Sequence, residues 1–227
     1  MKLAIWGSTQ TGKASLVFNF LNYYNLEKVR YKGEFEFEPP KTDSYVIKVL
    51  YDYRITNKIL NEYLLDRIEE DCVHLFMYRQ NLLSQYLALH HNEAIDNGTD
   101  PDVLDVHDCK AFIESQKNNT ARIYDTIKDL NVVAGSYEEI FHSDKVFDIF
   151  NKLNVDIKEE DVPHLIGPIK WEVQGKNKHT QARFTVNKGI EHFTYKENYS
   201  IIKNMFCEEY MYIDNDTREV KFLHHET

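Results

Sequence analysis

MKLAIWGSTQTGKASLVFNFL, residues 1–21, is the stretch that decides the fold of this chain. Residues 3–6 are apolar, residues 7–15 form a small polar turn with two glycines, and apolar residues then recur at helical spacing. This order predicts a strand, a loop and a helix. In such a unit the N–H groups of the loop and of the first helical turn converge on one spot, so the sequence predicts a site for a phosphate or sulfate group that needs no bound metal.

The loop matches the pattern G-x-x-x-x-G-K through Gly7, Gly12 and Lys13. Ala14 stands where magnesium-dependent nucleotide hydrolases and kinases carry the Ser or Thr that holds the metal, and the hydroxyl arrives one place later, at Ser15. The pattern therefore favours an anion-binding loop over an ordinary magnesium-dependent NTPase, with a purely structural glycine turn as the alternative.

Later strands supply no acidic residue that could serve as a second magnesium anchor. The apolar stretch 71–79 ends in Arg79, and the stretch 131–139 runs into Gly135 and Ser136. We therefore expect no metal site.

Composition predicts one domain with a substantial core. The chain has 227 residues, of which 42% are hydrophobic and 13% aromatic. We expect a single domain over 1–227, with an α/β core at 1–155 and a C-terminal lid or extension at 156–227. The net charge of −10 argues against a general nucleic-acid binder, and any anion site must be a local basic pocket.

Cysteine usage and hydropathy indicate the compartment. Cys72, Cys109 and Cys207 are odd in number and widely spaced, which is typical of free thiols in a reducing environment. No stretch reaches the length of a membrane span, and the N-terminal residues are typical of a core strand. We therefore expect a soluble, cytoplasmic protein.

Strands and helices alternate along the chain through residue 153, which predicts an α/β fold with a parallel sheet and helices on both faces. A last helix and a terminal hairpin are expected after a basic segment. The expected strands are 29–37, 44–53, 72–77 and 131–141; the expected helices are 57–70, 82–94, 108–130, 143–153 with Ser143 as N-cap, and 197–209; the hairpin is 211–223, turning at Asp214 to Asp216.

Four residues outside the loop are candidates for chemistry. Glu36 lies in an alternating acidic run and is either a solvated strand residue or a general base. Lys48 interrupts an apolar strand, and either points toward a ligand crevice or extends its ammonium to water. Arg79 follows a buried strand, where it could pair with a second anionic group. His90 is a weaker candidate for lining the cleft, and its neighbour His91 is expected to be solvated.

The basic segment within residues 156–190 has two interpretations. It is either a surface loop or a lid that closes over a phosphorylated ligand. Its positive residues are Lys170, Lys176, Lys178, Arg183 and Lys188.

Taken together, these pieces resemble the P-loop sulfotransferases, and among them the bacterial nodulation-type and trehalose-type enzymes with their viral and marine relatives. The resemblance covers roughly residues 1–155. It is carried by the stretches TGKAS (11–15), GEFEF (33–37), IKVLY (47–51), YRQNLLSQYLALHH (78–91) and SYEEIF (136–141). It implies a three-layer P-loop NTPase-like fold that binds 3′-phosphoadenosine 5′-phosphosulfate (PAPS) without a metal and transfers its sulfuryl group to an alcohol or amine.

The resemblance also implies roles for residues. Lys48 would stabilise charge on the bridging oxygen and Lys13 would help to hold the 5′-phosphosulfate, with Glu36 or His90 as the base. The 5′-phosphosulfate would lie on the loop, and the 3′-phosphate on Arg79, Ser84 and the basic segment. The implied donor-binding residues are Gln10, Thr11, Gly12, Lys13, Ala14, Ser15, Arg79, Ser84, Lys176, Lys178 and Arg183.

Three positions depart from the family pattern. Gln10 stands where members usually have Arg or Lys, and Gln80 and Ala88 stand at the positions of the Arg and Ser of the 3′-phosphate site. Two alternatives therefore stay open. One is a nucleoside or small-molecule kinase that uses ATP and magnesium, and the other is a non-catalytic descendant that keeps the sheet as a binding module.

Overall fold

The computed structural model describes residues 1–29, 42–51, 68, 70–100, 103–167, 199–206 and 209–224. Glu36, the expected helix at 57–70 and the cations of the basic segment (Lys170, Lys176, Lys178, Arg183, Lys188) lie outside the described residues.

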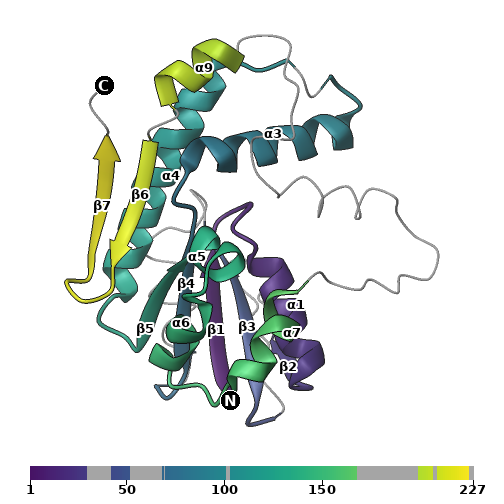
Figure 1. The fold of residues 1–227 in the computed structure, drawn as a ribbon, viewed down its shortest axis with the longest axis vertical. Helices are drawn as coiled ribbons and strands as arrows, with labels where there is room; N and C mark the ends of the chain where they lie inside the picture. Colours follow the sequence, from purple (N-terminus) through teal and green to yellow (C-terminus); the bar gives the residue numbers. More distant parts are fainter. Residues whose placement is uncertain are drawn as a thin grey trace.

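A sheet of five parallel strands forms the centre of the molecule, in the order β2–β3–β1–β4–β5 (Figure 1). β1 takes the middle of the sheet because both of its faces are apolar, and Leu3, Ala4, Ile5 and Trp6 are fully buried. The strands are β1 (Lys2–Gly7), β2 (Glu27–Val29), β3 (Tyr45–Leu50), β4 (Val73–Tyr78) and β5 (Val132–Ser136).

Helices cover both faces of the sheet, so the predicted three-layer α/β fold is confirmed. One apolar cluster joins Leu3 and Ile5 to α1 (Lys13–Tyr23), α5 (Tyr137–His142), α6 (Val146–Lys152) and α7 (Val162–Ile166), the last preceded by a 3₁₀ turn, η3 (Glu159–Asp161). The other cluster joins Ala4 and Trp6 to α3 (Leu82–Asn97), α4 (Val106–Ile127) and α9 (Tyr199–Phe206). Among the described residues, none of the helices is long and apolar enough to cross a membrane.

The predicted terminal helix and hairpin are confirmed. β6 (Glu209–Asp214) and β7 (Glu219–His224) form a two-stranded antiparallel sheet beside α4 (Figure 1). The Met211 N–H donates to the Gln80 carbonyl over 2.9 Å, so β6 is fixed to the loop after β4.

Two local predictions are wrong. The expected strand at 131–141 ends at Ser136, and α5 begins there because Ser136 and Glu139 form a reciprocal capping box. Ser143 does not cap the next helix, whose N-cap is Lys145; the Ser143 hydroxyl instead donates to the Glu139 carbonyl at the end of α5. The sequence pattern S-x-x-E at 136–139 carried the signal for this helix.

Candidate functional site

The loops after β1 and β4 meet at the carboxyl edge of the sheet. From β1 the chain continues to β2 and β3 on one side, and it then crosses to β4 on the other side of β1. In open α/β sheets the crevice at such a reversal of strand order is the usual place for a ligand. Residues 8–12 follow β1 and residues 79–81 follow β4, so these two loops form the candidate site.

The loop after β1 has two residues with left-handed backbone, Gln10 at φ 57° and Gly12 at φ 75°. At Gly12 only glycine fits, because a Cβ atom there would lie 2.5 Å from Cε2 of Phe141 and 2.9 Å from Cδ2 of Tyr137. α5 therefore packs directly against the start of α1, and the second glycine of the motif is required by this contact as well as by its φ angle.

Four side chains donate hydrogen bonds to successive carbonyls of the loop. Lys13 Nζ donates to the Gly7 carbonyl over 2.7 Å, and Thr11 Oγ1 donates to the Ser8 carbonyl over 3.0 Å. From the neighbouring loop and helix, Gln85 Nε2 donates to the Thr9 carbonyl over 2.6 Å and Arg79 Nε to the Gln10 carbonyl over 2.7 Å. Four successive peptide groups thus have their oxygens turned toward protein donors.

The same peptide groups also carry N–H donors. In a trans peptide the C=O and the following N–H point to opposite sides, so fixing the carbonyls of residues 7–10 also fixes the N–H groups of residues 8–11. No described residue accepts a hydrogen bond from the N–H of Gln10, Thr11, Gly12 or Ala14. Ala14 is exposed, so the opening of α1 is accessible from solvent. Converging donors at a helix N-terminus are suited to a tetrahedral anion.

Lys13 adds a full charge to this arrangement. Its side chain is only 4% exposed, and its ammonium lies inside the loop on the Gly7 carbonyl. An ammonium in so little contact with water interacts strongly with an anion bound at the same loop, because the screening there is weak.

Arg79 holds the loop through its hydrogen bond to the Gln10 carbonyl. The side chain is 5% exposed, its guanidinium carbon lies 3.5 Å from the centre of the Tyr137 ring, and Nη1 lies 3.7 Å from Oε1 of Glu138. Burial lowers the pKa of the Arg79 guanidinium, and the nearby Glu138 carboxylate opposes this. In this geometry Arg79 positions Gln10, and its expected contact with a 3′-phosphate stays a prediction.

The other candidates near β4 fall on the first turns of α3. The Gln80 N–H donates to Glu138 over 3.0 Å, and the Ser84 N–H donates to Oδ1 of Asn81, which caps the helix. Ala88 is buried at 3% exposure, so this position offers no polar group to a ligand. Of the two residues expected at a 3′-phosphate on this side, Ser84 thus lies in the first turn of α3 and Arg79 lies beneath the loop.

Lys48 lies on β3 and His90 on α3. Lys48 is level with Ile5, two residues before the end of β1, on the same face of the sheet as Val46. His90 lies on a different stripe of α3 from Gln85, with its ring 5.8 Å from that of Tyr86. From α3, it is Gln85 that reaches the loop.

Sequence reasoning missed Gln85, Tyr137 and Glu138. Gln85 is 1% exposed and also donates to Ser8 Oγ over 2.8 Å. A buried Gln one helical turn after the Asn81 N-cap is a polar residue that needs a partner, and this requirement was the available signal. Glu138 and Tyr137 belong to α5, which was expected as strand.

No family model matches the chain, and no curated protein matches it. Among solved structures, the chain is similar to mouse sulfotransferase SULT7A1 complexed with PAP, at 12% sequence identity and a TM-score of 0.49. The match covers 72% of this chain and 61% of the mouse chain, so this chain spans less than two thirds of that structure.

Proposed function

We propose that this chain is a PAPS-dependent sulfotransferase acting on a hydroxyl or amine of a carbohydrate, lipid or small-molecule acceptor. The observation that carries the proposal is the loop after β1, whose carbonyls at residues 7–10 are held by Lys13, Thr11, Gln85 and Arg79, which fixes the N–H groups of residues 8–11 just before the start of α1. The sequence resemblance stated above supplies the reaction class.

The residues present fit a phosphosulfate tail. Amides of Thr11, Gly12 and Ala14 would bind its oxygens, and the Lys13 ammonium would stabilise negative charge on the leaving phosphate. The sulfuryl group carries less negative charge than a phosphoryl group, so backbone amides and one cation can bind it. The position of the usual magnesium ligand is the exposed methyl group of Ala14, which offers no oxygen to a metal.

Further roles in the reaction are proposed for residues outside the loop. Lys48 would stabilise charge at the bridging oxygen, and Glu36 or His90 would take the acceptor's proton. The 3′-phosphate would bind to Ser84, Arg79 and the basic segment, which would act as part of a lid formed by residues 156–227.

A melting experiment tests the proposal. Adenosine 3′,5′-bisphosphate at about 100 times its Kd, with EDTA present, is expected to stabilise the protein by about 2.7 kcal/mol. For a chain of this size that is a rise in Tm of about 5–11 °C. Lys13→Ala removes the rise. The control is Lys110→Ala, which replaces a lysine that is 60% exposed on α4 and keeps the rise.

The same experiment separates the two rivals. A kinase is favoured by the match of Gly7, Gly12 and Lys13 to the motif, and it predicts a rise in Tm with ATP and magnesium only. A non-catalytic binding module is favoured by the buried Ala88 and the internal contacts of Arg79, and it predicts no rise with any nucleotide. Either result contradicts the sulfotransferase assignment.

A further inference from the structure

The outer edge of β7 carries backbone groups that point away from its hairpin partner. The Met211 and Ile213 N–H groups donate away from β7, to the Gln80 carbonyl and the Tyr78 hydroxyl. Their register partners on β7 are Phe222 and Val220. In an antiparallel ladder both members of such a non-hydrogen-bonded pair point their N–H and C=O outward. Val220 and Phe222 therefore present donors and acceptors on the side opposite β6.

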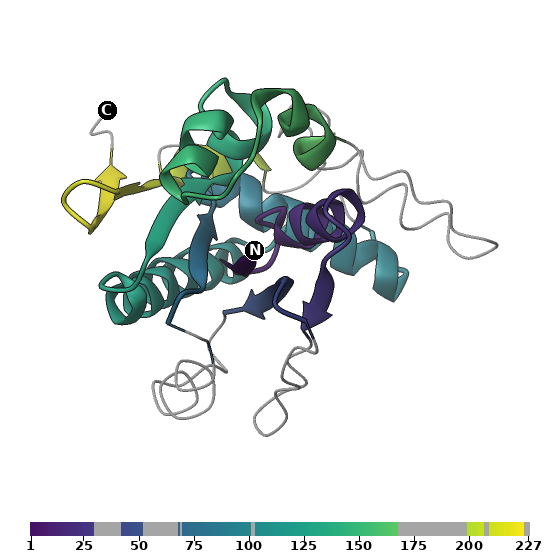
Figure 2. The ribbon, with the colours of Figure 1, turned by 90° about the horizontal axis from the view of Figure 1, so that it is seen from below.

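No described residue satisfies these groups. Within the described part of the chain, none accepts from or donates to the outward backbone of Val220 or Phe222. The β5 edge differs, because the Asn215 side chain accepts from the Ala134 N–H over 2.7 Å and donates to the Ala134 carbonyl over 2.9 Å. β7 lies at the periphery in two perpendicular views (Figures 1 and 2). The described residues thus pair with the β5 edge at Ala134 and leave the outer edge of β7 uncovered.

Each face of β7 carries an exposed apolar side chain. Phe222 is 38% exposed and Leu223 is 48% exposed, although consecutive strand residues point to opposite faces. The ring of Phe222 is covered in part by Lys117 from α4, whose Nζ lies 5.6 Å from its centre. A strand placed beyond the edge would cover both residues at once, whereas a ligand on one face would cover only one.

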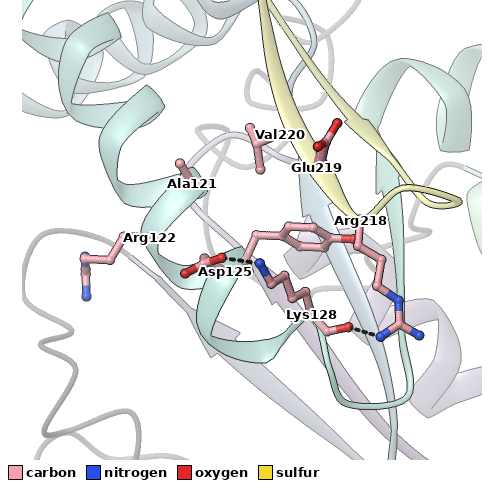
Figure 3. A pocket seen from close by; sticks show the side chains of 8 residues that line it. Ala121, Arg122, Asp125, Lys128, Arg218, Glu219 and Val220 are labelled. Atoms are coloured by element: carbon pink, nitrogen blue, oxygen red, sulfur yellow. Dashed lines mark hydrogen bonds and ion pairs between the residues drawn. The ribbon is translucent and has the colours of Figure 1, made fainter.

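A hollow lies beside the first residues of β7. It has a volume of about 520 Å³ and is bounded by α4 and the hairpin (Figure 3). Two of its charged residues are held by contacts beside it: Lys128 bonds Asp125, and Arg218 donates to the Lys128 carbonyl over 2.9 Å. The hollow thus separates part of α4 from the first residues of β7. Its lining residues are Ala121, Arg122, Tyr124, Asp125, Lys128, Arg218, Glu219 and Val220.

We propose that β7 pairs with β7 of a second copy of this chain, antiparallel about a two-fold axis at Phe222, so that the two hairpins form one four-stranded sheet. Only residues whose N–H and C=O point away from β6 can exchange hydrogen bonds with the second copy. The two-fold axis can therefore pass through such a residue or midway between two of them. Centring the axis on Phe222 pairs Phe222 with its own copy and Val220 with residue 224. The three hydrogen-bonded pairs exchange about six bonds.

The sequence of β7 selects this register. It places Lys221 opposite Leu223, where the aliphatic part of the lysine covers the exposed leucine. It also pairs two exposed aromatic rings, which stabilises antiparallel strands. Centring on Lys221 instead would place two ammonium groups face to face with only two hydrogen-bonded pairs. The charge of Lys221 is already balanced by Asp214, whose carboxylate lies 3.0 Å away, so the edge is not protected by a free charge.

Light scattering on the full chain tests the proposal. The expected result is a mass that rises with concentration from 27.0 kDa toward twice that value. Phe222→Glu places two carboxylates on the axis and is expected to give the monomer mass at every concentration. The control is Tyr212→Glu on β6, which replaces an aromatic residue of the same exposure, 39%, and leaves the dimer intact. Both variants should unfold as cooperatively as the wild type, which shows that each is folded.

A crosslink fixes the register. Residues in a hydrogen-bonded antiparallel pair have Cα atoms about 5.5 Å apart, within the range for a disulfide. Oxidised Phe222→Cys should therefore run as a covalent dimer on a non-reducing gel, while Tyr212→Cys should not. A wild-type mass of 27.0 kDa at the highest attainable concentration, or equal crosslinking by the two cysteine variants, would overturn the proposal.

Discussion

Gly12→Ala separates two reasons for a glycine in the loop. The backbone there has φ 75°, which costs an alanine about 1–2 kcal/mol relative to glycine. The added Cβ also meets Phe141 at 2.5 Å and Tyr137 at 2.9 Å, and overpacking of this kind costs about 1–3 kcal/mol. The free energy of unfolding should therefore fall by about 2–5 kcal/mol, as measured by urea denaturation.

Gly98 is the matched control for this experiment. It has φ 68°, close to that of Gly12, but a Cβ atom there would meet nothing within 4 Å. Gly98→Ala should therefore cost only the backbone strain of about 1–2 kcal/mol. In a Phe141→Ala background, Gly12→Ala should cost less than it does in the wild type, since the atom in the closest contact is gone. Equal losses for the two glycine variants, or an equal cost of Gly12→Ala in both backgrounds, would refute the packing of α5 against the loop.

Two further predictions concern buried cations and bases. Arg79→Lys keeps the charge but loses the Nε donor to Gln10 and the planar contact with Tyr137. The free energy of unfolding in urea should therefore fall by about 2–4 kcal/mol, and nucleotide binding should weaken. Unchanged binding would contradict a role of Arg79 in holding the loop. Burial lowers the pKa of His74 to about 4, with Trp6 Nε1 donating to Nδ1. The unfolded chain, with a histidine pKa near 6.5, takes up the proton first, so stability should be complete above pH 6.5 and fall by about 3 kcal/mol toward pH 4. His74→Gln should flatten this dependence in unfolding curves recorded across that range, and an equally steep curve would show that another group titrates.

The sheet could be predicted from the sequence because buried strands have a recognisable pattern of apolar residues. Residues 3–6 are apolar on both faces, which is the signature of a central parallel strand, and β1 is central. α5 was missed because residues 132–141 are too few for periodicity alone to separate one strand from a strand followed by a helix. Here the capping box of Ser136 and Glu139 sets the point where the strand ends and α5 begins.

The site was predicted at the loop but not beyond it. Gly7, Gly12 and Lys13 lie close together in the sequence, so their spacing alone predicts how they are arranged in space. Arg79 and Gln85 reach the same loop from about 70 residues away, and only the register of β1 beside β4 brings them there. A lysine or arginine pattern gives no information on whether the charge faces a ligand or a carbonyl, because that depends on burial by other elements.

The affinity of the loop for an anion should depend on the buried side chains that hold its carbonyls. Each peptide group from Gly7 to Thr11 can rotate only by breaking the hydrogen bond on its carbonyl, and all four of these bonds come from side chains that are at most 5% exposed. A rotated peptide would present an oxygen to an anion instead of an N–H, so the loss of one buried donor changes an attraction into a repulsion. Because water cannot replace a donor buried at Gln85 or Arg79, the protein holds the amides in place before any ligand arrives, and the ordering cost is met during folding.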